Sequence, residues 1–274
     1  MPDVDFLQIL ILALVQALTE FLPISSSAHL YLVSEWFGWD YQGLTFDLGL
    51  HLGTLFAVIA YYRRDLVVLA TDAARWRPGL ALTPNQRLVL AIGLATLPAG
   101  VVAMLMTDAL QDGLRNYWTI GLFQIVFGLL MYVADRWFRR DAHENSLTIG
   151  KAMLVGCAQA LALMPGVSRS GVTMTAALFL GLSREAAARF SFLLSIPVVS
   201  LASAKGVYDL LSGKAGEAIR IGDFFLGALI AAVAGYAVIA FLLAVLKRAG
   251  VAPFMWYRVV LGLFLLVQAW WLLP

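Results

Sequence analysis

Charge is scarce in this sequence. Only 13% of its 274 residues are Asp, Glu, Lys or Arg, whereas 61% are hydrophobic. Soluble domains carry about a quarter charged residues, so a water-soluble fold of this size could not cover its own surface. The composition therefore excludes an ordinary soluble domain and indicates an integral membrane protein.

Cysteine is almost absent as well. Cys157 stands alone, which excludes an internal disulfide and a cysteine-based metal site. The formal net charge of +2 is too small to favour nucleic acid as a partner. We also expect no cleavable signal peptide, because the N-terminus is acidic and no small-residue cleavage site follows the first apolar run.

Long apolar runs are what the sequence has in abundance. About 20 apolar residues suffice to cross a hydrocarbon core of roughly 30 Å. The segments that we expect to span the membrane are six, at residues 45–62, 88–106, 117–135, 187–204, 222–246 and 255–273. The predicted fold is all-α, with one polytopic membrane domain over residues 1–274 and no soluble appendage.

Two further apolar regions are interrupted in their middle. Polar residues and a proline between Glu20 and His29 divide residues 5–37, and the stretch 165–171 divides residues 151–182 in the same way. Each half is too short to cross a bilayer comfortably. Both regions therefore predict re-entrant helical hairpins.

The basic residues predict an orientation. If both hairpins enter and leave on one side, the loops at 63–87, 136–151, 184–189 and 247–258 share a side and hold fourteen Lys and Arg, against four on the opposite side. Because cytoplasmic loops are enriched in Lys and Arg, the basic side should be cytoplasmic. Both termini should then be periplasmic, and the two hairpins should enter from opposite sides and meet near the midplane.

A weak internal repeat supports this symmetry. Ala17, Pro23 and Ser26 match Ala160, Pro165 and Ser168, which suggests two halves at about 1–135 and 151–274. Inverted halves with broken helices are a plan known from transporters, and they place a ligand site at the breaks.

Gln16 and Glu20 lie before the first break, four residues apart and so on one helix face. A carboxylate at membrane depth costs a few kcal/mol and normally lines a cavity or binds an ion. An interhelical hydrogen bond without further function is the alternative.

Three serines and a histidine follow the first break. Ser25, Ser26 and Ser27 can cap the returning half-helix, whose free N–H groups and positive dipole end favour an anion. Ser26 and His29 are three residues apart, as a nucleophile and its base require. Capping alone is the simpler interpretation of the serines.

The second break has an arginine at the start of another half-helix. A guanidinium suits bidentate phosphate binding, and flanking hydroxyls and open backbone add further contacts. The pairing of Arg169 with Glu20 is the structural alternative, and both can hold if a phosphate separates the pair. The expected phosphate ligands around Arg169 are Gly166, Ser168, Ser170 and Gly171.

Asp47 and His51 lie one turn apart on the first spanning segment. Either they hold the residues of the site in place without touching the substrate, or they form interhelical polar contacts without further function. The sequence leaves both open.

Two motifs carry a family resemblance. Residues 16–29 (Gln-Ala-Leu-Thr-Glu-Phe-Leu-Pro-Ile-Ser-Ser-Ser-Ala-His) and 165–171 (Pro-Gly-Val-Ser-Arg-Ser-Gly) resemble the signatures of the undecaprenyl-diphosphate phosphatases of the bacitracin-resistance type. The similarity extends over essentially the whole chain, including residues 46–54 and 190–197.

The resemblance implies a bacterial inner-membrane enzyme that hydrolyses undecaprenyl diphosphate to undecaprenyl phosphate and so recycles the lipid carrier of cell-wall polymers. It also implies a divalent cation and catalytic roles for Glu20, Ser26, His29 and Arg169. That Glu20 holds this cation, as Mg²⁺ or Ca²⁺, directly or through water, is our own hypothesis. Gln16 occupies a position that holds Glu or Gln in the family, which weakens any scheme with two carboxylates from this helix.

The mechanism that we expect is metal-assisted phosphoryl transfer. Ser26 attacks and His29 takes its proton, or His29 itself is the nucleophile. The expected partners are the polyprenyl diphosphate and membrane lipids, with a homodimer left open and the site facing the periplasm. The rival function is transport, either as a polyprenyl-phosphate flippase or as an ion-coupled carrier on the same fold.

Overall fold

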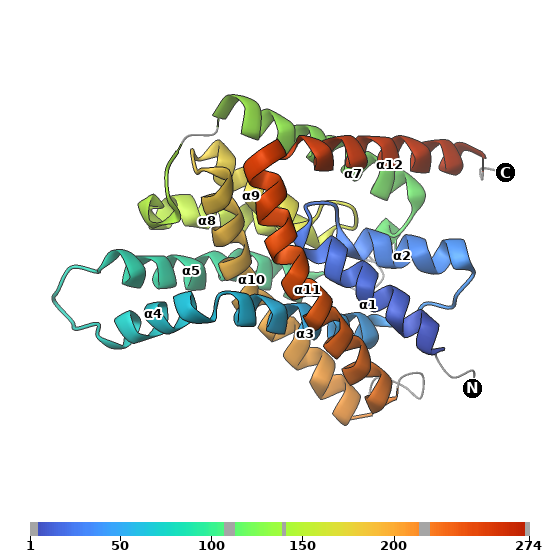
Figure 1. The fold of residues 1–274 in the computed structure, drawn as a ribbon, viewed down its shortest axis with the longest axis horizontal. Helices are drawn as coiled ribbons and strands as arrows, with labels where there is room; N and C mark the ends of the chain where they lie inside the picture. The colour runs from blue at the N-terminus through green and yellow to red at the C-terminus, as the bar shows by residue number, and fades with distance from the viewer. Residues whose placement is uncertain (1–4, 107–112, 139–140, 214–219, 272–274) are drawn as a thin grey trace.

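The structure is a computed structural model that describes residues 5–106, 113–138, 141–213 and 220–271 (Figure 1). Within these ranges the regular structure is helical, apart from an isolated β-bridge between Ala142 and Leu182. The predicted all-α class is confirmed. The α-helices are α1 (Phe6–Phe21), α2 (Ser26–Phe37), α3 (Leu44–Tyr61), α4 (Arg63–Ala74), α5 (Pro84–Leu105), α7 (Tyr117–Val133), α8 (Ile149–Ala160), α9 (Arg169–Phe179), α10 (Arg184–Leu211), α11 (Ile221–Ala249) and α12 (Ala252–Trp271).

Six helices in the described ranges are long and apolar enough to cross a membrane. They are α3, α5, α7 with its π-helical continuation to Phe138, α10, α11 and α12. Each corresponds to one predicted span, although α10 runs further than expected, to Leu211. The end of the predicted 255–273 span lies outside the described residues, as do Arg139, Arg140 and Lys214 of the charge count.

The expected loop at 63–87 is in part wrong, because it contains α4. This helix packs along α5, and the turn between them is held at Thr83. The Thr83 hydroxyl accepts from the Gln86 N–H at 3.2 Å and donates to the Asp72 carboxylate at 2.5 Å. A capping box of this kind starts a helix sharply. The loop prediction failed because α4 is short and carries several charged residues.

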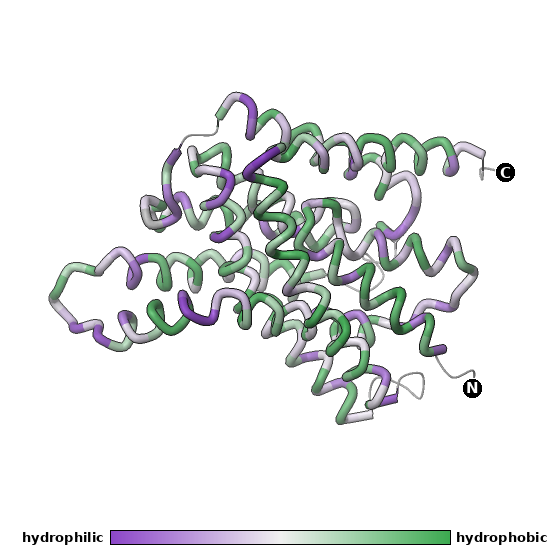
Figure 2. The backbone as a smooth tube through the Cα atoms, viewed as in Figure 1, coloured by the Kyte–Doolittle hydropathy of each residue, from purple (hydrophilic) through white to green (hydrophobic). Residues whose placement is uncertain are grey.

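The outer surface of the long helices is apolar. Large hydrophobic side chains are exposed there, among them Leu97 and Leu105 on α5, Val233 on α11 and Val260 on α12. Figure 2 shows hydrophobic residues along these helices and hydrophilic ones at the connections from α3 to α4 and from α11 to α12. An apolar surface of this extent suits contact with lipid.

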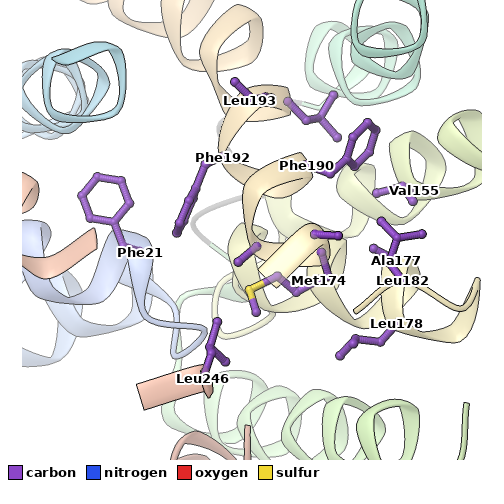
Figure 3. Close-up of a cluster of buried hydrophobic side chains, with 14 of the residues drawn as sticks. Phe21, Val155, Met174, Ala177, Leu178, Leu182, Phe190, Phe192, Leu193 and Leu246 are labelled. Atoms are coloured by element: carbon purple, nitrogen blue, oxygen red, sulfur yellow. The ribbon is translucent and has the colours of Figure 1, made fainter. Parts of the chain in front are cut away.

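A buried core lies beside the end of α1 (Figure 3). Phe21 of α1 packs edge to face on Phe192 of α10, with ring centroids 5.5 Å apart, and Met174 of α9 and Leu246 of α11 belong to the same cluster. Four helices from both halves of the chain are thereby packed together next to the first break.

Small residues allow two helix pairs to approach closely. A Cβ added at Gly53 of α3 would overlap the backbone of Ala228 in α11, and one at Gly156 of α8 would overlap that of Ala95 in α5. Close approach through small residues is the usual device for packing helices inside a bilayer. The separations of α3 from α11 and of α8 from α5 are therefore closely constrained.

Candidate active site

The first break separates α1 from α2. Helix α1 ends at Phe21, and Pro23, which has no N–H to continue the helix, lies in the connection. Ser25 then takes a left-handed conformation, with φ of 78°, before α2 begins at Ser26. Such a backbone is uncommon for a residue other than glycine and often marks a functional position.

The second break repeats this device. Helix α8 passes into a 3₁₀ turn at Leu161–Leu163, and Ser168 has φ of 74° directly before α9 begins at Arg169. The Ser168 hydroxyl caps α9 by accepting from the Gly171 N–H at 3.1 Å. Ser25 and Ser168 are the two non-glycine residues with positive φ in the described part of the chain.

The two breaks are hydrogen-bonded to each other, as their predicted meeting requires. The N–H of Gly166 donates to the Ser25 hydroxyl at 3.1 Å, and the Ser170 hydroxyl donates to the Leu22 carbonyl at 3.3 Å. Residues separated by more than 140 positions in the sequence therefore form one site.

Arg258 joins the same two breaks and corrects the sequence analysis, which assigned it to a basic loop. It lies within α12, fully buried, and donates to the carbonyls of Pro23 at 2.9 Å, Gly166 at 2.7 Å and Val167 at 3.1 Å. It also donates to the carbonyls of Phe123 and Gln124 on α7. The carbonyls at an interrupted helix need donors. The signal that was missed is an arginine inside an apolar run.

Glu20 is the centre of the site. Its Oε1 accepts from Arg169 Nη2 at 2.5 Å, and its Oε2 accepts from the Ser26 hydroxyl at 2.6 Å and from Gln16 Nε2 at 3.2 Å. His51 Nε2 approaches Oε2 at 3.4 Å. The carboxylate is buried, and these donors offset the desolvation that a buried charge otherwise suffers.

Two buried polar atoms in this cluster have no hydrogen-bond partner among the described residues. They are Nη1 of Arg169 and Oε1 of Gln16. Unsatisfied buried polar atoms are rare and call for an explanation. The N–H groups of Arg169 Nη1 can bind an anion, and the oxygen of Gln16 can bind a cation.

The structure does not bring His29 to Ser26 in the way that the sequence analysis expected. The Ser26 hydroxyl donates to Glu20 instead. His29 Nδ1 lies 2.7 Å from the Ser25 carbonyl, and Nε2 lies 2.6 Å from the hydroxyl of Tyr257. Tyr257 was not predicted, because nothing in a single sequence connects positions 228 residues apart.

Of the pair Asp47 and His51, only the His51 side chain contacts Glu20 within the described part of the chain. The backbone carbonyl of Asp47 holds the His51 ring through Nδ1 at 2.7 Å. The Asp47 carboxylate accepts from the Tyr41 hydroxyl at 2.8 Å. Burial, followed by the nearby Asp47 charge, raises the pKa of Tyr41 above its usual range, so this hydroxyl keeps its proton.

The predicted phosphate-binding glycines have packing contacts in the structure. A Cβ at Gly166, where φ is 93°, would come within 3.0 Å of the Ile120 carbonyl, and one at Gly171 within 3.0 Å of Arg258 Nη1. Ser170 is buried against Leu22, and Ser27 is an exposed residue whose hydroxyl lies 3.4 Å from that of Ser25. Phosphate contacts by these residues stay a prediction.

An apolar pocket of about 430 Å³ opens beside His29. Its apolar lining includes Leu18 of α1, Leu22 directly after α1, Val33 of α2 and Phe254 of α12, and Thr19, His29 and Tyr257 form its polar part. A hydrocarbon chain fits such a lining, and a phosphate does not.

The oxygen atoms of Glu20 and Gln16 supply part of the ligand set that a divalent cation needs. Glu20 and the unpartnered Gln16 Oε1 are hard oxygen ligands of the kind that Mg²⁺ and Ca²⁺ prefer. Within the described ranges no group of three or more His, Cys, Asp or Glu side chains is placed to hold a metal. These residues therefore suit a cation that takes most of its ligands from the oxygens of a phosphorylated substrate.

Comparison with known proteins identifies a family. Residues 9–264 match the family model described as bacitracin resistance protein BacA. The chain is 46% identical over 266 residues to the undecaprenyl-diphosphatase of Thioalkalivibrio sulfidiphilus, covering 97% of this chain and 100% of that protein. It is 47% identical over 269 residues to undecaprenyl-diphosphatase 2 of Stutzerimonas stutzeri, covering 96% and 98%. The chain therefore belongs to the bacitracin resistance protein BacA family.

Proposed function

We propose that this membrane protein hydrolyses undecaprenyl diphosphate to undecaprenyl phosphate and inorganic phosphate. Relatives at 46–47% identity carry the name undecaprenyl-diphosphatase. The observation that carries the proposal is the contact of Glu20 with both Ser26, at 2.6 Å, and Arg169, at 2.5 Å. A hydroxyl, an acceptor for its proton and a guanidinium lie within one hydrogen-bonded unit, as phosphoryl transfer requires.

Ser26 is the nucleophile in this proposal. Its Oγ attacks the terminal phosphorus, the bond from phosphorus to the bridging oxygen breaks, and undecaprenyl phosphate leaves. Glu20 takes the serine proton, because the hydroxyl already donates to its Oε2. This replaces His29 as the first base, since the described contacts of His29 lie with Ser25 and Tyr257.

Arg169 binds the terminal phosphate. One nitrogen, Nη2, is held by Glu20, while the buried Nη1 has no partner in the described residues. A guanidinium fixed in this way is oriented before the substrate arrives, so little side-chain entropy is lost on binding. The charge that develops on the phosphoryl oxygens is thereby stabilised.

Water then releases phosphate from Ser26. The water oxygen bonds to phosphorus, the bond to Ser26 Oγ breaks, and the proton held on Glu20 returns to Oγ. The proton lost by the water passes to Nε2 of His29. The role of His29 as the nucleophile, which the sequence left open, is less favoured, because among the described residues its ring bonds to Ser25 and Tyr257 and not to Glu20 or Arg169.

Glu20 and Gln16 would hold the divalent cation that the family resemblance implies. When bound, the cation supplies neutralisation of phosphate charge. Metal dependence is part of the proposal and is tested with it.

The two breaks belong to re-entrant hairpins in an inverted repeat. The matching left-handed serines, Ser25 and Ser168, support the repeat and shift its register by one residue from the predicted match of Ser26 with Ser168. Helix packing supports it too, because α1 contacts α11 just as α8 contacts α5. We keep the repeat halves at about 1–135 and 151–274.

The basic side is cytoplasmic in this proposal. Lys and Arg remain strongly biased to that side after Arg258 is removed from the count. In Figure 1 the start of α1 and the end of α12 lie at the same end of the molecule, opposite the turn between α4 and α5. Both termini would then be periplasmic, and the substrate would enter from that side.

The test is phosphate release from undecaprenyl diphosphate by detergent-purified protein, with and without a chelator. The proposal predicts release that stops on chelation and resumes when Mg²⁺ or Ca²⁺ is added. Release that is unaffected by the chelator would remove the cation from the mechanism. If no phosphate appears and proteoliposomes instead move undecaprenyl phosphate between leaflets, the transport function that the repeat suggests would replace the enzyme.

A further inference from the structure

Tyr257 of α12 contacts His29 through both its hydroxyl and its ring. The hydroxyl lies 2.6 Å from Nε2, and the two rings are stacked with centroids 5.6 Å apart and planes 17° apart. The imidazole is buried, whereas the tyrosine is 43% exposed. Tyr257 therefore lies between His29 and the exterior of the protein.

These contacts select one form of His29. The Ser25 carbonyl only accepts hydrogen bonds, so Nδ1, which lies 2.7 Å away, carries a proton. In the neutral ring Nε2 is then the acceptor, and the Tyr257 hydroxyl donates to it. Arg258, the next residue on α12, adds a buried positive charge at the breaks that favours a neutral imidazole.

The position of the pair relates it to the substrate. His29 and Tyr257 line the apolar pocket, and the Ser25 carbonyl that holds the histidine belongs to the first break. The ring of His29 thus touches both the first break and a space suited to hydrocarbon.

We propose that Tyr257 is a positioning residue, which holds His29 as the Nδ1-protonated tautomer with Nε2 ready to accept a proton during release of phosphate from Ser26. The hydroxyl leaves Nε2 when the Tyr257 side chain, which is 43% exposed, changes rotamer, so no backbone movement is needed. This inference rests on the proposed phosphatase function and adds a residue to it.

The first test is nitrogen NMR of the histidines in Tyr257→Phe, which keeps the ring and removes the hydroxyl. With three histidines in the chain, His29→Gln assigns the signal. We expect wild-type His29 to be protonated at Nδ1 with a hydrogen-bonded Nε2, and the Nε2 signal to move in Tyr257→Phe. Tyr236→Phe is the matched control, because Tyr236 is equally exposed, at 43%, and packs on Tyr61 away from the site. It should leave the signal unchanged.

The second test separates positioning from lipid binding. We expect Tyr257→Phe to lower kcat about tenfold, a modest part of what acid–base catalysis contributes, while KM stays within about twofold because the ring still lines the pocket. A raised KM with unchanged kcat, or an unchanged His29 signal, would overturn the proposal. If wild-type protein released no phosphate, the proposed function would fail, whereas the NMR comparison would still decide whether Tyr257 holds His29.

Discussion

The two breaks share a backbone device and differ in chemistry. Each passes through a left-handed serine, Ser25 at φ 78° and Ser168 at φ 74°, into the start of a short helix. The first break brings the carboxylate of Glu20 and the hydroxyl of Ser26, and the second brings the guanidinium of Arg169. The first break thus supplies the groups that would form the bond to phosphorus, and the second break supplies the charge that would bind the phosphate.

Removing the proposed nucleophile should lower kcat the most. We expect Ser26→Ala to lower kcat by about 10⁴-fold or more, because no other described hydroxyl donates to Glu20. Phosphate release from detergent-purified protein measures it. Ser34→Ala, at a buried serine further along α2, is the control and should keep its activity. Residual turnover within tenfold of wild type would exclude Ser26 as the attacking group.

Removing the carboxylate should have the next largest effect. Glu20→Gln keeps the shape but loses the proton acceptor and the partner of Arg169, and we expect kcat to fall about 10³-fold. The matched control is Glu144→Gln, because Glu144 is also buried and paired with an arginine, Arg189. Equal losses in the two variants, at equal amounts of folded protein, would contradict the central position of Glu20.

Replacing the guanidinium by another cation should have a smaller effect. Arg169→Lys keeps the charge but cannot serve Glu20 and a phosphate with two separate planar nitrogens, so we expect kcat/KM to fall about 10- to 100-fold. Arg184→Lys provides the comparison, because Arg184 binds Asp135 with two nitrogens outside the site. If Arg169→Lys equalled wild type in steady-state kinetics, a single point charge would be enough.

Substitutions of the two left-handed serines, which change the free energy of unfolding, should have the smallest effects. Both glycine and alanine lose the serine hydrogen bond. Glycine adopts positive φ without strain, whereas alanine keeps the backbone strain. We therefore expect Ser25→Gly and Ser168→Gly to be more stable than the Ala variants at the same positions by about 1 kcal/mol. Thermal unfolding in detergent measures the difference. An alanine variant as stable as the glycine variant would show that the left-handed conformation is not retained.

The spans and breaks could be predicted from sequence because their signals are local. Apolar length set the six spans, and proline with clustered polar residues located the breaks near Pro23 and Pro165. The contact between Glu20 and Arg169, which the sequence offered as the structural alternative to phosphate binding, is present, because opposite charges buried in lipid pair with each other.

The remaining contacts could not be predicted because they depend on which helix faces run together. Arg258 looked like a loop residue until α12 placed it against five carbonyls. The spacing of Ser26 and His29 allowed a pair, but the path of the break turned the hydroxyl toward Glu20 and the imidazole toward Tyr257. Helical spacing states which side chains can meet and does not state which do.

The most direct test of a single site shared by both breaks is the initial rate of phosphate release from undecaprenyl diphosphate by Arg169→Ala protein, compared with wild type at equal amounts of folded enzyme. If the second break binds the phosphate that the first break attacks, wild type releases phosphate and Arg169→Ala releases almost none. Turnover of Arg169→Ala near the wild-type rate would contradict the shared site.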